Sequence, residues 1–575
     1  MTAPKVSAWN SFLIGILLAV GWLATDHYRP WTSFHSEVPA ALAGAVAVFH
    51  ALRGRASVGI APEAATLLLL SILPWLQRAA GIVLFDGDAL LASLYLCGTG
   101  LCLWAGGAST EAERSALLRT LVLTIVAVSI ASTGVGLCQW FGIDGPEGSA
   151  LWAVRLTPGA RTAGNLAQSN HVATLIAFGI AGVIWLRANG RVGGAVACLT
   201  LAFLLLGLAM TQSRTIWVSG PLLAGWMVCR PGSMLRPLRL SAPAVLLLGS
   251  WYAVALSAAV ALPEHLQLAD ASASTAGRLT SGAGRQVMWS SWWHAIELSP
   301  WVGHGWQQGH LAQGAAAPMA FAYAYSGYAH NIFLDLLAWN GLPLGGGLSI
   351  LAVAWYLRAG LRVNGADQWF RFAVLTLFAC HALVEYPHAY AYFLVPVALL
   401  TGQQIADAPQ TRWPVPRFAL AVLATACLGS VAAIVHDYLE IEADTRVLRA
   451  EKLHIGGVRT SEPPNDILVL DQMYALAKAL RTEAQPGMAA ASLDELLRVV
   501  HRFPMRYLLQ ETVAALALNG RETEARAEMQ RLYGMYGPTG HAAALTWLRD
   551  RGARVGGALP AFVGELEAAG PPALR

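Results

Sequence analysis

Short polar segments interrupt an otherwise apolar chain, and their residue types suit chemistry on a charged substrate. The segment RTAGNLAQSNH starts at Arg161 and brings Gln168 and Asn170 to the beginning of an apolar run. A helix that begins there offers unpaired backbone N–H groups and the positive end of its dipole, which together favour an anion. One polar side chain is expected to cap this helix. Because a cap needs only one side chain, we predict that Arg161, Gln168 and Asn170 bind an anion or a sugar.

Further arginines lie in breaks between apolar runs. Arg214 lies in the short segment TQSRT, where its reach is restricted. A restrained guanidinium suits bidentate contact with phosphate, and the alternative is that Arg214 extends to lipid headgroups. Arg278 and Arg285 lie in GRLTSGAGR, whose glycines let the backbone approach a phosphate closely. The alternative for this segment is a solvated loop.

The segment YAHNIFLDLLAWNGLPLGGG contains a candidate general base. His330 and Asn331 precede a long apolar run, so they are predicted to open a helix. The dipole of that helix disfavours a protonated imidazole, and a neutral imidazole can accept a proton. Asp335 lies about one helical turn deeper and needs a partner, because an unpaired carboxylate is costly in an apolar environment.

The segment HALVEYPHAYAYFLVP offers a pair of metal-ligand types and a tyrosine. His381 and Glu385 are one helical turn apart, but two ligands make a weak metal site. We therefore favour a structural His–Glu contact and predict no metal and no cofactor. Tyr386, beside Pro387 in a turn, is placed to touch substrate. A set rich in arginine and amide groups suits a diphosphate leaving group, whose developing charge arginines can stabilise.

The elements that position these residues are predicted to be membrane-spanning helices. The 575 residues are 56% hydrophobic and 13% charged, with a mean hydropathy of +0.50, whereas a soluble domain carries roughly 25% charged residues. Runs long enough for a span, about 20 residues, predict an all-α polytopic membrane protein of about 12 to 13 transmembrane helices. The runs lie at 8–25, 39–53, 60–79, 88–106, 116–142, 169–187, 194–212, 214–229, 242–262, 330–358, 370–385, 389–405 and 417–436.

Basic residues in alternate breaks indicate the orientation. Arg187 and Arg191, and later Arg358 and Arg362, mark cytoplasmic breaks by the positive-inside rule. The loop 263–329 and all the polar segments described above then emerge on the opposite side. The net charge of +4 is too small to indicate a nucleic-acid partner. It fits the excess of basic residues in the cytoplasmic loops of a protein that is surrounded by membrane lipid.

The composition changes at residue 437. Residues 1–436 form the predicted transmembrane body, and residues 437–575 are charged enough for a water-facing, helical tail. Within the tail, 503–537 is predicted to be a helix, a turn and a second helix, close to a tetratricopeptide unit of about 34 residues. A plain helical hairpin is the alternative. The seven cysteines all fall in apolar segments without a CxxC pair, so we predict no disulfide framework.

These motifs resemble those of a known superfamily. His330–Asn331, followed after nine residues by Gly341, resembles the signature of the O-antigen ligase superfamily. That superfamily joins bacterial O-antigen ligases, O-antigen polymerases and protein O-oligosaccharyltransferases. GNLAQSNH (164–171) and EYPHAYAYFL (385–394), together with the helical tail, resemble its O-oligosaccharyltransferase branch.

The resemblance implies a GT-C-like glycosyltransferase of the bacterial inner membrane. Such an enzyme transfers O-antigen or oligosaccharide en bloc from undecaprenyl diphosphate to an acceptor hydroxyl on the periplasmic side, with inversion and without a metal. By motif, His330 would be the catalytic base. Arg161, Arg214 and Arg285 would bind the diphosphate, and Gln168 and Tyr386 would lie near donor or acceptor.

The acceptor is the least specified part of this expectation. Protein-glycosylating members usually carry proline where this chain has Ser169, which favours lipid A–core as the acceptor over a protein serine or threonine. An O-antigen polymerase and a transporter of lipid-linked glycans are further alternatives. A transporter is expected to place ionisable residues near the bilayer midplane, whereas the charged candidates here lie at the outer ends of the predicted spans.

Overall fold

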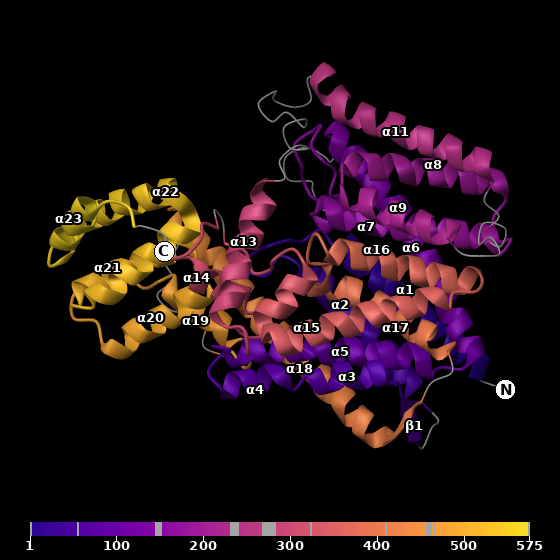
Figure 1. Cartoon of the computed structure of the whole chain (residues 1–575), viewed down its shortest axis with the longest axis horizontal. Coiled ribbons are helices and arrows are strands. Elements are labelled where there is room, and N and C mark those ends of the chain that lie inside the picture. Colours follow the sequence, from indigo (N-terminus) through magenta and orange to yellow (C-terminus); the bar gives the residue numbers. More distant parts are fainter. Residues whose placement is uncertain are drawn as a thin grey trace. The chain divides into compact units, whose positions relative to one another are not determined.

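The regular secondary structure of the chain is almost entirely helical in a computed structural model (Figure 1). The structure describes residues 3–53, 57–143, 152–229, 238, 241–266, 283–322, 325–408, 411–455, 463–464 and 466–572. Helix accounts for 76% of it. The strands found in the described residues, β1 (Ser57–Ile60) and β2 (Trp413–Pro416), pair antiparallel with Ser57 opposite Pro416. The predicted all-α fold class is confirmed.

The chain divides into two compact units that are not continuous in sequence. The first unit comprises Met1–Leu69, Tyr95–Thr280 and Ala354–Val431, and the second comprises Leu70–Leu94, Ser281–Val353 and Ala432–Arg575. Among the described helices, α5 (Asp86–Ala108), α15 (Ile332–Leu361) and α18 (Arg417–Lys452) contribute several residues to each unit, and α3 (Pro62–Leu70) contributes its last residue to the second.

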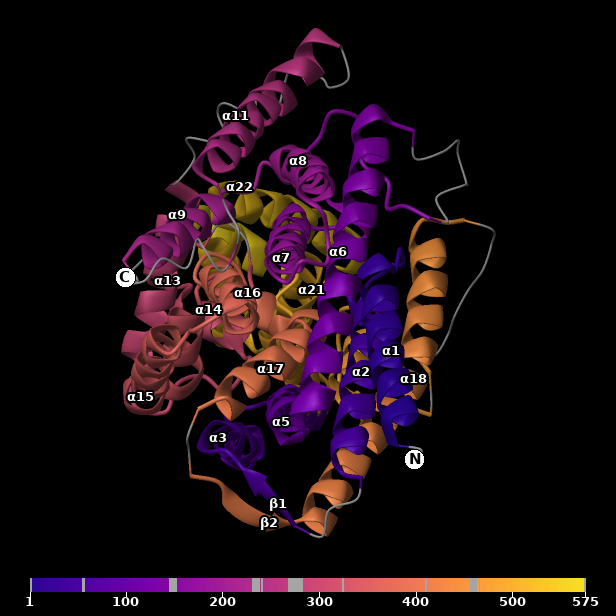
Figure 2. The ribbon, with the colours of Figure 1, turned by 90° about the vertical axis from the view of Figure 1, so that its right-hand side faces the viewer.

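The first unit holds most of the apolar helices, with α6 packed against α1, α7 and α8; Figure 2 shows α6 beside α1 and α7. Its other elements are α1 (Ala3–Leu23), α2 (Phe34–Ala51), α3 (Pro62–Leu70), α6 (Glu111–Phe141), η1 (Gly164–Leu166), α7 (Ser169–Ala188), α8 (Gly194–Thr211), α9 (Thr215–Val228), α11 (Ala242–His265), α16 (Ala366–Ala382), η2 (Pro387–Ala389) and α17 (Ala391–Ala406).

Small residues let the helices around α6 approach closely. A side chain at Gly179 of α7 would collide with Ser129 of α6, and one at Gly207 of α8 would collide with Thr133 of α6. Close backbone approach at small residues is the usual way that helices associate in membranes, where lipid removes much of the hydrophobic driving force between them. This packing fixes the ends of α7 and α8, where the polar segments described below are attached.

The second unit contains the helical hairpin predicted in 503–537, formed by α21 (Arg506–Leu518) and the start of α22 (Glu522–Val555). Gly520, with φ 76°, forms the turn between α21 and α22, a conformation that glycine adopts without strain. Leu509 and Val513 of α21 and Leu532 of α22 are buried between the two helices. The elements of this unit are α4 (Leu73–Ala79), α13 (Ala283–Leu298), α14 (Gly309–Ala316), α19 (Asp471–Ala479), α20 (Ala490–Arg502), α21 (Arg506–Leu518), α22 (Glu522–Val555) and α23 (Leu559–Ala569).

Seven of the described helices are long and apolar enough to cross a membrane, and the segments Ala8–Leu23 and Ala391–Ala406 are shorter apolar helices. The chain is therefore a polytopic membrane protein. On α11, Leu246 and Leu247 are 71% and 64% exposed, as suits side chains that contact lipid. The long apolar helices are α5, α6, α7, α8, α11 over Ala242–Pro263, α15 and α18.

Two predicted spans have interruptions. The run expected at 60–79 is divided into α3 and α4, because Pro74 near the start of α4 has no N–H to continue the helix from α3. Helix α15 is kinked at Gly341, whose φ of 74° and ψ of 174° are not helical. A prediction from apolar length alone does not detect either interruption.

Candidate functional site

The polar segment before α7 ends in a cap. Gln168 has extended backbone angles, and its side-chain oxygen accepts a hydrogen bond from the backbone N–H of His171 at 2.8 Å. This is the usual geometry of an N-cap. Gln168 therefore performs the capping that we expected of one residue in this segment, which leaves Asn170 available for contacts away from its own helix.

Arg161 connects the end of α8 to the start of α7. Its Nε donates to the backbone oxygen of Thr211 at 2.8 Å, and its Nη2 donates to Oδ1 of Asn170 at 3.1 Å. Thr211 is the last residue of α8. The carbonyl groups in the last turn of a helix have no partner within that helix. The guanidinium is thus held in a defined orientation by two elements of the first unit.

Asn170 links this arginine to a carboxylate far along the chain. Its Oδ1 also accepts from Ser213 Oγ at 2.9 Å, and its Nδ2 donates to Oε1 of Glu385 at 3.0 Å. We call Arg161, Asn170, Ser213 and Glu385 the Arg161 network. The sequence did not assign Glu385 to this cluster, because its partner lies 215 residues away.

We predicted a structural contact between His381 and Glu385, but the side chain of each residue bonds with a residue of α7. His381 Nδ1 bonds with Thr174 Oγ1 at 2.9 Å, and Glu385 binds Asn170. The two residues meet through the backbone, where the N–H of Glu385 donates to the oxygen of His381 at 2.8 Å. The one-turn spacing therefore places them on one helical turn and directs both side chains towards α7.

Arg214 and Tyr386 belong to turns of the same unit. Arg214 is exposed at the N-cap position of α9, directly after Ser213 of the Arg161 network. Tyr386 stacks on Tyr390 with ring centroids 5.8 Å apart. Burial raises the pKa of Tyr386 above its usual value, although a hydrogen bond with Tyr390 acts in the opposite direction. Its hydroxyl is therefore protonated at neutral pH and can donate a hydrogen bond.

The chemistry that this part of the first unit supports is anion binding. Helices α7 and α9 both begin here, and a helix N-terminus favours negative charge. Arg161 has an oriented guanidinium, which suits bidentate contact with phosphate oxygens. The cluster contains one carboxylate, Glu385, and that group already accepts a hydrogen bond from Asn170.

The capping role of Gln168 can be tested by stability. Gln168→Ala is expected to lower the free energy of unfolding by about 1 kcal/mol, because the N–H of His171 loses its side-chain acceptor and keeps only the backbone oxygen of residue 168, at 3.1 Å. Gln168→Ser should restore most of this loss, since serine is a preferred N-cap. Thermal unfolding of the purified variants in one detergent measures the difference. Equal stability of the wild type and Gln168→Ala would contradict the cap.

His330 lies in the second unit, in the turn that leads into α15. Asn331 caps the helix, with its Oδ1 accepting from the N–H of Phe333 at 3.0 Å and of Leu334 at 3.3 Å. His330 has φ 55°, in the left-handed region that residues other than glycine rarely adopt. Such a conformation is kept where the surrounding structure holds it, and it is frequent at functional sites.

The backbone before His330 is held by two side chains. Asp335 Oδ1 accepts from the N–H of Ala329 at 2.7 Å, so the buried carboxylate has a backbone partner. Trp289 of α13 donates from Nε1 to the oxygen of Ala329 at 2.9 Å. The backbone N–H and the backbone oxygen of Ala329, the residue before His330, are thus both held, and this restrains the backbone from which the His330 side chain projects.

The predicted site residues fall into one group in each unit. Arg161, Gln168, Asn170, Arg214 and Tyr386 belong to the first unit, and His330 and Asn331 belong to the second. Arg285 is in the first turn of α13 in the second unit, and its side chain is not among those described. Arg278 lies outside the described residues.

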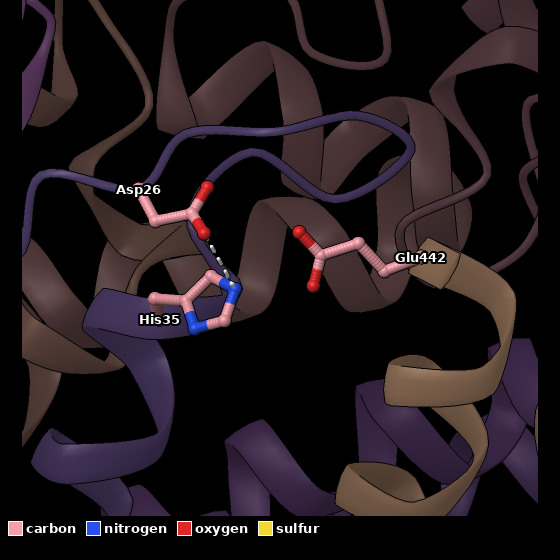
Figure 3. Close-up of side chains that lie close together, drawn as sticks. All are labelled: Asp26, His35 and Glu442. Atoms are coloured by element: carbon pink, nitrogen blue, oxygen red, sulfur yellow. Dashed lines mark ion pairs between the residues drawn. The ribbon is translucent and has the colours of Figure 1, made fainter. Parts of the chain in front are cut away.

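An acid–histidine pair in the first unit offers two groups of metal-ligand type. Figure 3 shows Asp26 and His35, whose Oδ2 and Nε2 atoms are 3.5 Å apart. The figure also labels Glu442 of the second unit, which accepts a hydrogen bond from Arg446 at 2.8 Å. Two protein ligands are fewer than metal sites ordinarily use, so we assign no metal to the Asp26–His35 pair.

Three family models match segments that contain most of the predicted residues. Residues 199–349, with Arg214, Arg285 and His330, match the model described as O-Antigen ligase. Residues 163–186 match Protein glycosylation ligase, and residues 369–548 match Virulence factor membrane-bound polymerase, C-terminal. Gln168 and Asn170 lie in the second of these segments, and Tyr386 lies in the third.

Two proteins of Acinetobacter baylyi (strain ATCC 33305 / BD413 / ADP1) are similar to this chain. A General O-oligosaccharyltransferase is 26% identical over 536 residues, which are 90% of this chain and 91% of the relative. A ComP-specific O-oligosaccharyltransferase is 30% identical over 243 residues, which are 42% of this chain and 43% of the relative. The first similarity extends over both compact units, and therefore over both groups of predicted residues.

Proposed function

We propose that this chain, which belongs to the O-antigen ligase superfamily, transfers a glycan en bloc from a polyprenyl diphosphate to a serine or threonine hydroxyl of an acceptor protein. The observation that carries the proposal is the similarity over 90% of the chain to a General O-oligosaccharyltransferase. Ser169, where protein-glycosylating members usually carry proline, by itself favours lipid A–core. The names of the two relatives support a protein acceptor instead, and lipid A–core becomes the second candidate.

The proposed reaction is a single displacement at the anomeric carbon of the donor. The acceptor oxygen forms a bond to that carbon while its proton passes to a nitrogen of His330. The bond between the carbon and the diphosphate oxygen breaks, its electron pair leaves with the polyprenyl diphosphate, and the configuration inverts. General base catalysis of this kind requires a neutral imidazole within hydrogen-bond reach of the attacking hydroxyl.

The developing charge on the leaving diphosphate needs fixed positive groups. Arg161 is held by Thr211 and Asn170, and Arg214 follows Ser213 of the same network. Oriented donors stabilise a transition state without reorganising during the reaction. We infer that Arg161 and Arg214, with Arg285, supply this stabilisation without a metal ion, and that Tyr386 donates to donor or acceptor.

The proposed place of the reaction is the periplasmic face of the bacterial inner membrane. The long apolar helices support a membrane location, and the arginines in alternate breaks support the orientation. A polyprenyl chain is itself apolar and would remain among the helices, with its diphosphate at their outer ends. The C-terminal tail would then lie in the periplasm, where acceptor proteins are exported.

A parallel acceptor assay tests the function. Purified protein and a labelled lipid-linked glycan are mixed separately with a pilin-like protein, with lipid A–core and with a second lipid-linked repeat. We expect glycan on a serine or threonine of the protein, identified by mass spectrometry. The matched control is the same acceptor with that serine or threonine replaced by alanine, which should remain unmodified.

Each other result identifies a different activity. Product only on lipid A–core would replace the protein acceptor with a lipopolysaccharide acceptor, and elongated lipid-linked glycan would indicate a polymerase. If no acceptor is modified but the donor crosses a liposome bilayer that contains the protein, the proposed transferase function is wrong.

A further inference from the structure

A buried ion pair within the second unit joins the C-terminal tail to the start of α5. Arg502 of α20 donates from Nε to Asp88 Oδ2 at 2.7 Å and from Nη2 to Asp88 Oδ1 at 2.8 Å. The side chains are only 16% and 2% exposed. Bidentate pairing of this kind is among the stronger polar contacts in proteins, so the guanidinium has a fixed position.

The same guanidinium contacts a histidine. Arg502 Nη1 lies 3.1 Å from Nδ1 of His310, near the start of α14. Because a guanidinium can only donate, Nδ1 of His310 must be the acceptor and carries no proton. Burial, followed by the positive charge of Arg502, lowers the pKa of His310 to about 3. The ring is therefore neutral at neutral pH, and its tautomer is set by Arg502.

The ring of His310 in turn lies against the segment that leads to His330. A side-chain carbon added at Gly327 would lie 2.8 Å from Cε1 and 3.2 Å from Nε2 of His310. The backbone oxygen of Gly327 is also closely packed on Gly309. The first turn of α14 thus forms the surface on which Gly327 rests, with no room for movement towards it.

Polar contacts continue from this surface towards His330. Gln313 of α14 accepts from the N–H of Ser326 at 2.8 Å, and Ser326 Oγ donates to the oxygen of Tyr328 at 2.7 Å. The next residue, Ala329, is held by Asp335 and Trp289. Contacts from Arg502 through His310 to Gly327, and then the covalent chain from Gly327 to Ala329, therefore connect the ion pair to the residue before His330.

We propose that Arg502 is a positioning residue for the transfer reaction: through His310 it holds the segment Ser326–Ala329 and so sets the place of His330. The inference rests on the proposed function, in which His330 is the base. It gives the tail a role in the second unit, which contains His330, because the residue that positions the base belongs to α20.

The first test compares two tail arginines in equivalent ion pairs. Arg502→Lys keeps the charge but loses the two-pronged contact with Asp88 and the bond to His310. We expect kcat to fall roughly tenfold, less than the hundredfold that a 1 Å misplacement can cause, with the KM values within about twofold of the wild type. Steady-state transfer rates measure this separation.

Arg481→Lys is the matched control. Arg481 donates to both oxygens of Asp444, at 3.1 and 2.5 Å, and these side chains are 11% and 10% exposed. Arg481→Lys should lower thermal stability about as much as Arg502→Lys does, but it should leave kcat unchanged. An equal fall in kcat in both variants would overturn the proposal, because destabilisation alone would then explain the effect.

A double variant tests whether Arg502 acts through the histidine. His310→Asn retains an acceptor near the position of Nδ1 but lacks the part of the ring that packs on Gly327. If the two residues act in series, Arg502→Lys combined with His310→Asn should lower kcat no more than the more severe single variant, within about twofold. Multiplied losses would show separate routes and overturn the proposal.

Hydrogen exchange separates this inference from the proposed function, because it needs no activity. In Arg502→Lys, and not in Arg481→Lys, the amides of Ser326 and Ala329 should exchange faster than in the wild type. Unchanged exchange in this segment would overturn the positioning role whatever the enzyme activity. A wild-type protein that transfers no glycan would instead overturn the function on which the inference rests.

Discussion

Replacing His330 is expected to lower the rate of glycan transfer by roughly 10²- to 10⁴-fold, the range that a positioned general base contributes. The acceptor hydroxyl would have to lose its proton to water, while the contacts that bind the diphosphate remain. Donor binding should therefore be unchanged. Transfer of a labelled lipid-linked glycan, followed under single-turnover conditions, measures the rate, and binding of the donor to the same preparation measures the affinity.

The conformation of His330 decides which variant gives the clearest result. Its φ of 55° is strained for alanine, whereas asparagine adopts this region more readily. His330→Asn should therefore keep the turn and still lose the base, and we expect it to be as inactive as His330→Ala. If His330→Asn retains near-normal turnover, the backbone and not the imidazole is what the reaction needs, and the general-base assignment is wrong.

Another histidine of the second unit supplies the control for this experiment. His294 of α13 is paired with Glu297 at 3.0 Å, and the two side chains are 35% and 52% exposed. His294→Ala removes an imidazole of the same unit without touching the turn at His330, so its transfer rate should equal that of the wild type. Thermal unfolding of the three histidine variants checks that each remains folded.

Local sequence patterns predicted the helices well, because membrane spans are set by apolar length. The run from 169 to 187 became α7 and the run from 242 to 262 became α11, with boundaries within a few residues. The break between α3 and α4 was missed. A proline near a helix start looks the same in sequence whether the chain before it is helical or turning, so apolar length does not distinguish one span from two short helices.

The candidate site was predicted less completely, because its contacts join distant parts of the chain. The polar segment before α7 correctly indicated a helix start, but the assignment of the cap to Gln168 depends on its extended backbone. Glu385 binds Asn170 from 215 residues away. Arg502 and Asp88 are 414 residues apart. Which arginine meets which carboxylate is decided by the packing of whole helices, and no local spacing encodes it.

Arg161 should be the most sensitive of the proposed diphosphate ligands in the first unit. Arg161→Gln is expected to raise the KM for the lipid-linked donor roughly 10- to 100-fold, since a hydrogen bond to a charged group contributes about 1.5–3 kcal/mol. Arg161→Lys should recover only part of this loss. A lysine has the charge but cannot reproduce the fixed fork that Thr211 and Asn170 orient.

The Arg161 network predicts that replacing Asn170, an uncharged neighbour of Arg161, also raises the KM for the donor. Asn170→Leu removes the acceptor of Arg161 Nη2 and the donor to Glu385, so the guanidinium loses its orientation while its charge remains. The donor KM should rise in this variant too, by less than in Arg161→Gln.

Arg187→Lys, in the last turn of α7, is the control and should leave the donor KM unchanged. If Arg161→Gln and Arg187→Lys bind and use the donor equally well, Arg161 is a structural connection between α7 and α8, and the diphosphate must be bound by other residues.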